Sequence, residues 1–338
     1  MKYPKLFPLL VCFFVLSCAS VLKRPLEMVG IDVSRKPLEG PLFPIERDYK
    51  WGYIDSKGRV VIKPVWEAAL EYREGLAAVK KNGLWGYISE AGRVVIDIKY
   101  KRAESFSEGL ALVESGGKNF YIDREGLIKI ASHFDVNGPF RDGLAVFSYA
   151  GKWGYIDREG EVVIRPEFER AGHFSSGVAL VEVDGATGFV NRAGGVRFVE
   201  GVGDIDTFSE GLARVKVGDK WGFVDRKAKI VIEPVFDWVS GFSEGLAPVE
   251  IDGKWGFLDP SGRLALEPRF QATFGFTEGM ARIVMDKKFG YINPRGNVVI
   301  EPVYKIGYEF RNGLAIVEID DLLWGYVNTS GDLVWKSR

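Results

Sequence analysis

Apolar residues along the chain fall in short alternating runs separated by glycine-rich turns. No stretch long enough for a helix carries apolar residues at the i, i+3, i+4 spacing that buries one helix face. A representative segment predicts three short strands at 212–217, 221–225 and 230–232, with a turn at Gly218-Asp219 between the first two. The pattern therefore predicts an all-β chain.

The same pattern returns with a period of 34 residues. The string Gly-Leu-Ala or a close variant marks each unit, with its glycine at Gly75, Gly109, Gly143, Gly177, Gly211, Gly245, Gly279 and Gly313. Trp-Gly keeps the same period, with its tryptophan at Trp51, Trp85, Trp153, Trp221, Trp255 and Trp324. The last step is one residue longer because of an insertion near Asp320-Asp321. Residues 41–338 therefore form one domain of nine units, the last of them truncated.

The turn between the second and third strands has a fixed chemistry. Its first residue is a short polar one, at Asp55, Ser89, Asp123, Asp157, Asn191, Asp225, Asp259, Asn293 and Asn328. Such a side chain accepts a hydrogen bond from the backbone two residues on. Glycine stands three residues later in every unit but the one with Ala228, as a type I turn closed by a residue at positive φ requires. The aspartates could also be taken for a metal-binding series, but we favour the turn.

A proline–aromatic segment follows the third strand, as in Pro166-Glu167-Phe168, and a second aromatic follows it, as at Phe174. Because proline donates no ladder hydrogen bond, we expect an edge strand or an ordered crossover here, with the aromatics filling the seam between units. Trp66 and Trp238 lie in this segment, outside the Trp-Gly register. They are our candidates for exposed contacts with a partner.

The Trp-Gly pairs and two rows of charge each allow two interpretations. We favour a tryptophan ring packed between units, with a glycine that admits the neighbouring backbone, over an exposed row that stacks on sugars. Lysines precede the Trp-Gly position at Lys50, Lys118, Lys152, Lys220, Lys254 and Lys288. Acids precede the Gly-Leu-Ala position at Glu74, Glu108, Asp142, Glu210, Glu244 and Glu278. We favour solvated edges with weak ion pairs for both rows over rows that bind a ligand.

The string Lys-Trp-Gly-Tyr-Ile-Asp at 152–157, with the downstream Val-Ile-Arg-Pro at 163–166, resembles the WG (or KWG) repeat family of bacterial proteins. The resemblance covers residues 41–338. It implies an all-β repeat module, often exported, that serves as a scaffold or interaction surface, and it brings no catalytic residues to transfer. Units three and five depart from the motif, with Asn119 and Thr187 for tryptophan and Ser132 and Glu200 for proline.

Two architectures fit such an array. An open superhelical stack is favoured, because no N-terminal strand is evidently reserved to complete the last unit and nine exceeds the usual four to eight blades of a propeller. A closed β-propeller is the alternative.

The N-terminus predicts export. Lys2 and Lys5 precede an apolar run at 6–16 that is too short to span a bilayer and suits a signal peptide. The run ends before Cys18 in a string that resembles the lipobox of bacterial lipoproteins, although Leu16 stands where a small residue is commoner. We therefore expect a signal peptide at 1–17 and a tether at 18–40 lipidated on Cys18, in the cell envelope and at the outer membrane. Plain secretion and a cytoplasmic chain are the alternatives.

Charge and reactive residues indicate little chemistry. The formal charge of −1, from 45 basic and 46 acidic residues, gives no attraction to nucleic acid. The two histidines, His133 and His173, fall at different places in the repeat, and the only other cysteine, Cys12, lies in the signal peptide. We expect no catalytic residue, cofactor or metal. The expected function is a non-enzymatic envelope surface that binds a protein or glycan, with the lipid anchor as the only membrane contact; a passive spacer and a hydrolase built on units three and five are the alternatives.

Overall fold

The computed structural model describes residues 40–337. Within that range every regular element is a β-strand, and no helix is long and apolar enough to cross a membrane. The predicted signal peptide, the tether and Cys18 lie outside the described residues.

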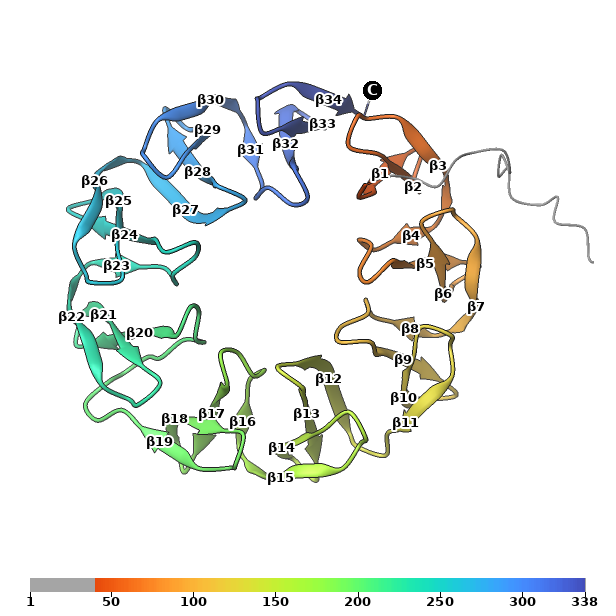
Figure 1. Ribbon diagram of the computed structural model, residues 1–338, viewed down its shortest axis with the longest axis horizontal. Coiled ribbons are helices and arrows are strands. Elements are labelled where there is room, and N and C mark those ends of the chain that lie inside the picture. The colour runs from red at the N-terminus through yellow and green to blue at the C-terminus, as the bar shows by residue number, and fades with distance from the viewer. Residues whose placement is uncertain (1–39, 338) are drawn as a thin grey trace, which may run out of the picture. The chain divides into compact units, whose positions relative to one another are not determined.

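The strands form nine small antiparallel sheets arranged in a ring, so the protein is a nine-bladed β-propeller (Figure 1). Blades 1–3 consist of β1 (Phe43–Arg47), β2 (Lys50–Ile54) and β3 (Val60–Trp66); β4 (Ala68–Ala69), β5 (Leu76–Lys81), β6 (Leu84–Ser89) and β7 (Val94–Tyr100); and β8 (Arg102–Ala103), β9 (Ala111–Ser115), β10 (Lys118–Ile122) and β11 (Ile128–Ala131). Blades 4–6 consist of β12 (Val136–Arg141), β13 (Leu144–Tyr149), β14 (Lys152–Ile156) and β15 (Val162–Phe168); β16 (Arg170–Ala171), β17 (Val178–Val183), β18 (Ala186–Asn191) and β19 (Val196–Phe198); and β20 (Leu212–Val217), β21 (Lys220–Asp225) and β22 (Ile230–Phe236). Blades 7–9 consist of β23 (Trp238–Val239), β24 (Ala247–Ile251), β25 (Lys254–Leu258) and β26 (Leu264–Phe270); β27 (Ala272–Thr277), β28 (Met280–Met285), β29 (Lys288–Ile292) and β30 (Val298–Tyr304); and β31 (Ile306–Gly307), β32 (Leu314–Asp320), β33 (Leu323–Asn328) and β34 (Leu333–Lys336).

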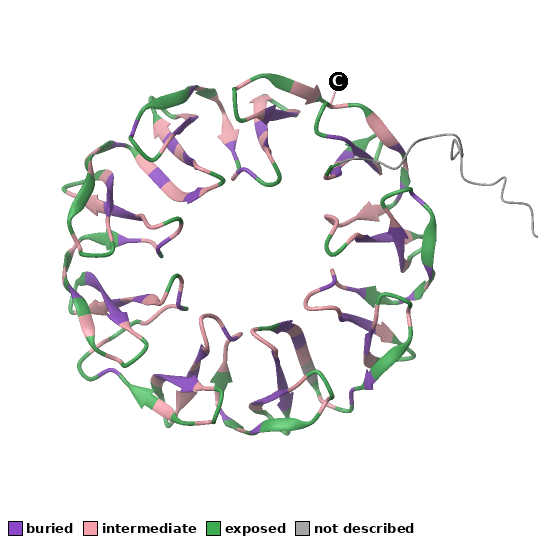
Figure 2. Ribbon diagram, in the orientation of Figure 1, coloured by how far each residue is buried: buried purple, intermediate pink, exposed green. Residues whose placement is uncertain are grey.

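The three strands predicted in each unit are confirmed, and a fourth strand was missed. This fourth strand follows the proline–aromatic segment and pairs as the innermost strand of the next blade; in blade 2, Ala68 and Ala69 pair with Lys80 and Val79. It is two residues long in blade 2 and six residues long in blades 4 and 8. The proline–aromatic segment itself continues the outer strand of the preceding blade, as Pro166 does in β15, so the predicted edge strand is confirmed. Figure 2 shows these outer strands as the exposed perimeter of the ring, with the buried residues inside the blades.

The turns also form as predicted. In blade 4 the Asp157 carboxylate accepts hydrogen bonds from the backbone nitrogens of Glu159 (3.1 Å) and Glu161 (2.8 Å). Gly160 closes the turn at a φ of 87°. The aspartate series therefore consists of turn residues.

The Trp-Gly pair faces a bulge in the outer strand. Trp153 pairs with Phe168 and Tyr155 with Ile164, so extra residues of β15 lie opposite Gly154. A Cβ on Gly154 would lie 2.5 Å from the carbonyl oxygen of Ile164, well inside van der Waals contact. The close backbone approach assigned to this glycine is confirmed. Trp153 is only half-buried at the edge of the core, and the residue that fills the core is Tyr155, two positions later.

The core consists of one apolar cluster between each pair of neighbouring blades. Edge-to-face aromatic pairs recur in these clusters, such as Tyr87 with Phe106 at 5.0 Å between ring centroids. The tyrosine hydroxyl also donates to a carbonyl of the next blade's inner segment, from Tyr87 to Glu104 at 2.7 Å. The second aromatic of each unit, for example Phe174, is buried in the same cluster, so its predicted place in the seam is confirmed.

The ring is closed, and the favoured open stack is wrong. Leu314 and Tyr326 of blade 9 pack with Phe43, Ile45 and Ile54 of blade 1 in the ninth cluster. No strand is exchanged between these two blades among the described residues. Within residues 40–337 the ring closes by face-to-face packing of blade 9 on blade 1, which buries the last apolar faces.

Candidate functional site

The two tryptophans predicted as surface contacts have different environments. Trp66 is 1% exposed and belongs to the cluster between blades 1 and 2, so the prediction of a surface contact is wrong for this residue. It ends β3 opposite Trp51 after the bulge, and this register turns its ring into the core. Trp238 is 38% exposed, and its ring lies 4.8 Å from that of Trp221, with the Arg214 guanidinium 5.0 Å from each ring. Its role as a partner contact stays a prediction.

The acidic row occupies the turns that point to the centre of the ring (Figure 1). Each acid stands with the following glycine at positive φ in a two-residue hairpin turn, for example Glu108 at 53° and Gly109 at 82°. The carboxylate accepts a hydrogen bond from the backbone of the same turn in the next blade, as Glu108 does from Gly143 at 2.9 Å. The same bond forms from Gly109, Gly177, Gly245, Gly279 and Gly313. The acids therefore join neighbouring turns and form neither simple solvated edges nor a free ligand row.

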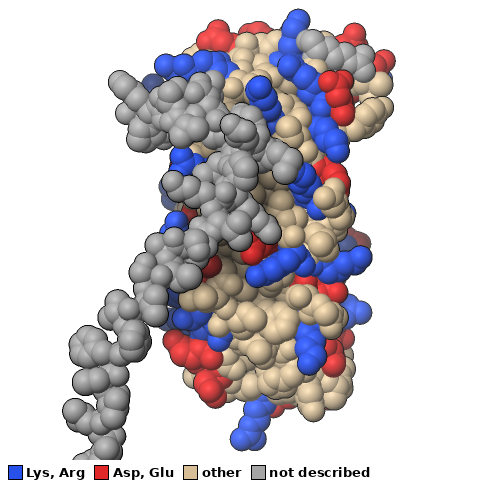
Figure 3. Space-filling view, turned by 90° about the vertical axis from the view of Figure 1, so that its right-hand side faces the viewer, with Lys and Arg blue, Asp and Glu red and all other residues tan. Residues whose placement is uncertain are grey.

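The lysine row is largely solvated. Lys152 and Lys220 each form an exposed ion pair, with Glu169 at 3.6 Å and with Asp237 at 2.5 Å. Figure 3 shows one side of the outer wall, where basic and acidic side chains are interspersed over uncharged surface. The part of this face that is not covered by grey atoms carries side chains of both signs (Figure 3).

The histidines lie in segments of different blades. His133 precedes blade 4, is exposed, and packs against Phe134 with 4.5 Å between ring centroids. His173 lies beside Gly138, and burial, together with Arg141, lowers the pKa of its imidazole. Among the residues that the structure describes, no group of three or more histidine, cysteine or acidic side chains is placed to hold a metal ion.

The nine-fold repetition is broken at blade 1. Within residues 40–337 this blade has three strands, and β1 pairs only with β2. By the 34-residue period, Ile45 and Glu46 correspond to Val79 and Lys80, which pair with the inner strand of blade 2. Blade 6 also has three strands, but its inner edge is covered because Ile205 bridges to Val215 and Gly203 donates to Lys216. Counting only residues 40–337, blade 1 is the one blade whose inner edge has no backbone partner.

A side-chain hydroxyl bonds a backbone carbonyl at this edge of β1. In blade 2 the carbonyl of Ala78 accepts from the Leu70 nitrogen of the inner segment at 2.9 Å. The corresponding carbonyl in blade 1 is that of Pro44, and it accepts from the Tyr326 hydroxyl of blade 9 at 2.8 Å. Burial raises the pKa of Tyr326, which keeps this hydroxyl protonated as a donor. In other blades the equivalent tyrosine hydroxyl donates to a carbonyl of the inner segment, as Tyr87 does to Glu104, whereas Tyr326 donates to a carbonyl of β1.

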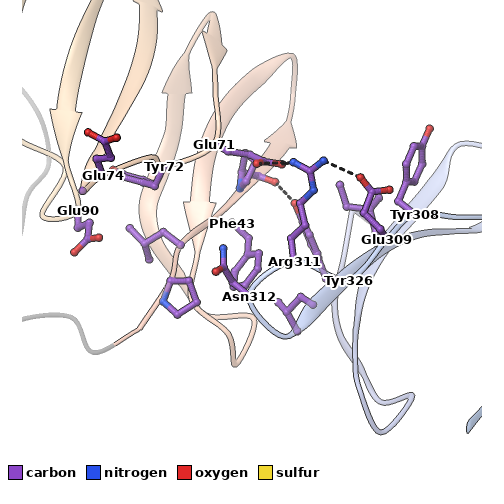
Figure 4. A pocket seen from close by; sticks show the side chains of 16 residues that line it. Phe43, Glu71, Tyr72, Glu74, Glu90, Tyr308, Glu309, Arg311, Asn312 and Tyr326 are labelled. Atoms are coloured by element: carbon purple, nitrogen blue, oxygen red, sulfur yellow. Dashed lines mark hydrogen bonds and ion pairs between the residues drawn. The ribbon is translucent and has the colours of Figure 1, made fainter. Parts of the chain in front are cut away.

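A pocket of about 530 Å³ lies at this seam between blades 9 and 1 (Figure 4). Pro41 and Phe43 of blade 1, Ile316 and Tyr326 of blade 9 and Tyr72 of blade 2 supply apolar and aromatic lining. The charged lining consists of Glu71, Glu74, Glu90, Glu309 and Arg311. The pocket thus combines aromatic walls with an excess of carboxylates.

Arg311 of blade 9 forms an ion pair with blade 2. Its guanidinium lies 3.0 Å from the Glu71 carboxylate of blade 2 and 2.7 Å from that of Glu309 in its own blade (Figure 4). Burial of Glu309 opposes its ionisation, but a backbone hydrogen bond, Arg311 and Arg282 outweigh burial and lower its pKa. Hydrogen bonding to Glu309 raises the pKa of Arg311. Blades 9 and 2 are therefore linked by an ion pair across the position where blade 1 would carry its inner turn.

Fold and sequence together define a repeat β-propeller. The sequence profile of the WG containing repeat matches residues 51–85, 85–118, 120–153, 153–185, 202–221, 221–255, 255–289 and 289–322. The chain belongs to this family, and the predicted family is confirmed. The gap between the fourth and fifth matches falls in unit five, where Thr187 and Glu200 depart from the motif.

One solved structure with a TM-score above 0.5 supports the fold alone. A crystal structure of a eukaryotic initiation factor is similar with a TM-score of 0.62 at 9% identity, over 88% of this chain and 96% of that one. BamB from Moraxella catarrhalis is similar with a TM-score of 0.38 at 12% identity, over 76% of this chain and 94% of that one. No curated protein matches the sequence.

Proposed function

We propose that the chain is an exported lipoprotein, anchored in the outer membrane through acyl chains on Cys18, whose propeller binds a protein or glycan partner without catalysing a reaction. The seam pocket is the binding site in this proposal. The observation that carries it is the pocket beside blade 1, which has only three strands within residues 40–337, so that the repeated framework has an unlike surface there.

The composition of the pocket supports binding. Its tyrosines and Phe43 offer area for packing, and its carboxylates give direction to polar contacts. Most other inner turns are bonded to one another through the acidic row. The seam departs from this repeat, because Arg311 of blade 9 pairs there with Glu71 of blade 2.

The anchor and the binding role can be tested separately. Cys18→Ser should abolish incorporation of labelled palmitate and move the chain from the membrane fraction to the soluble one. For binding, the immobilised full chain is exposed to detergent-solubilised envelope proteins and, in a second arm, to soluble peptidoglycan fragments. Saturable capture should be lost in Glu71→Lys, which reverses charge in the pocket, and kept in Glu125→Lys, a matched change at an exposed turn of blade 3.

A passive spacer makes the opposite prediction. Without a soluble ligand, neither fraction would show saturable capture, and the two lysine variants would behave as the wild type does. Equal loss of capture in both variants would show that the seam is not the site.

A further inference from the structure

Within residues 40–337, the inner edge of β1 presents backbone groups that no strand pairs with. In blade 3 the inner segment donates from Lys101 to the carbonyl of Glu114 at 2.8 Å and from Glu104 to that of Leu112 at 2.9 Å. The equivalent acceptors in blade 1 are the carbonyls of Glu46 and Pro44. The Pro44 carbonyl holds only the Tyr326 hydroxyl, and no strand within residues 40–337 pairs with this edge. An extended peptide that donates to both carbonyls would complete blade 1 as its fourth strand.

The other eight blades show which side chains such a strand carries. A small or medium-sized residue lies opposite the second strand of the blade. The aromatic residue three positions later packs its ring against a tyrosine or phenylalanine ring of the preceding blade. The pairs are Ala69 and Tyr72, Ala103 and Phe106, Asn137 and Phe140, Ala171 and Phe174, Ile205 and Phe208, Val239 and Phe242, Thr273 and Phe276, and Gly307 and Phe310. At the seam the ring that would receive this aromatic is that of Tyr326, which instead contacts Phe43 at 5.6 Å.

The chain's own sequence departs from this pattern. The residues in phase with the pair are Arg35 and Leu38, so a long cation stands at the small position and no aromatic at the other. Arginine is a poor substitute there, because the equivalent Val239 is fully buried and Ala103 nearly so. The pattern favours a strand from another polypeptide.

We propose that the seam binds an extended segment of a partner protein, which adds to the inner edge of β1 as a strand. The segment carries a small residue, an aromatic three positions later, and at least one lysine or arginine. The basic residue stands just before the small residue, where it faces the Glu46 carboxylate, as Arg170 faces Glu182 at 3.4 Å at the same position of blade 5. This inference rests on the proposed binding function and specifies its partner as a peptide.

The test uses a fluorescent peptide and the full chain. The probe has the sequence of residues 101–106, Lys-Arg-Ala-Glu-Ser-Phe, which forms the inner segment of blade 3. Binding should be saturable. Methylation of the peptide's fourth backbone nitrogen, the donor to the Pro44 carbonyl, should weaken it at least about ten-fold without altering any side chain. Replacing its Lys-Arg by Gln-Gln, or Glu46→Gln in the protein, should weaken binding several-fold and flatten its dependence on salt, because this register places the peptide's arginine opposite Glu46.

Three results would overturn the proposal. The N-methylated peptide could bind as well as the parent, which would leave side-chain contacts without strand addition. The wild-type chain could fail to bind while Leu38→Asp binds, which would show that the chain's own residues 34–39 cover the edge. Neither chain could bind, in which case the edge takes no peptide. Because the assay uses a synthetic peptide, it is independent of export and of capture from envelopes, so failure here and failure of the proposed function are distinguishable.

Discussion

A substitution at the glycine of the Trp-Gly motif tests whether close approach of the β15 backbone requires a residue without a Cβ. In Gly154→Ala the new Cβ would lie 2.5 Å from the Ile164 oxygen, 2.8 Å from the Pro166 nitrogen and 2.9 Å from the Arg165 carbonyl carbon. All three atoms belong to the backbone of β15, so no side chain can rotate away to make room. The bulge must shift against β14, and we expect a loss of about 3 kcal/mol, at the upper end of the range for overpacking.

Two other glycines of the same region separate the clash from other effects of a methyl group. Gly151 has a φ of 77° and open space around it, so Gly151→Ala should cost about 1 kcal/mol for backbone strain alone. Gly172 has a nearest neighbour at 3.7 Å, so Gly172→Ala should change stability by less than about 0.5 kcal/mol.

The measurement is urea unfolding followed by tryptophan fluorescence, with midpoints compared among variants of equal m value. The account predicts that Gly154→Ala loses most, Gly151→Ala less and Gly172→Ala least. If Gly154→Ala unfolds within about 1 kcal/mol of Gly172→Ala, close backbone approach is not the reason for this glycine.

Three further predictions follow from the ring. The acidic row is interrupted at Ser176, so Ser176→Glu should supply an acceptor for the Gly211 nitrogen and stabilise the chain by about 1 kcal/mol. Glu108→Ala should destabilise it by about the same amount, and unfolding midpoints that move the other way would contradict the role of the row. Trp66→Ala should cost about 3–5 kcal/mol because its ring is buried between blades, whereas the half-exposed Trp238 should cost about 1 kcal/mol, and equal losses in thermal unfolding would be inconsistent with their burial. The pKa of Glu309 is lowered on folding, so its stabilising effect is present above the unfolded value of about 4.3 and is lost as pH falls through the folded value. The difference in unfolding midpoint between wild type and Glu309→Gln should therefore shrink at acid pH, and a difference that grew instead would mean that the sign is wrong.

Much of each blade could be predicted from the sequence because its signals are local. The turn beginning at Asp157 follows from a short polar side chain and a glycine three residues later, and both perform the expected roles. The strand at 212–217 follows from alternation and is observed with the same bounds. Such features depend on neighbours in sequence, so one copy of the repeat suffices to predict them.

The features that were missed depend on contacts between blades. The inner strand of blade 2 is only two residues long and pairs with a strand of the following unit, so it has no periodicity of its own. Trp66 lies in a segment whose bulge decides which side chains face the core, and the sequence does not reveal that register. Ring closure and the seam pocket depend on how blade 9 meets blade 1, and their residues, such as Glu71 and Arg311, are 240 positions apart.

No strand within residues 40–337 pairs with the inner edge of blade 1, and hydrogen exchange of the full chain tests most directly whether a partner strand binds there. The Glu46 amide faces this edge, whereas its counterpart in blade 7, the Glu250 amide, faces β23. We predict that Glu46 exchanges faster than Glu250 in the free chain and becomes protected when the 101–106 peptide is added. Equal protection of the two amides in the free chain, or no change at Glu46 with saturating peptide, would contradict the account.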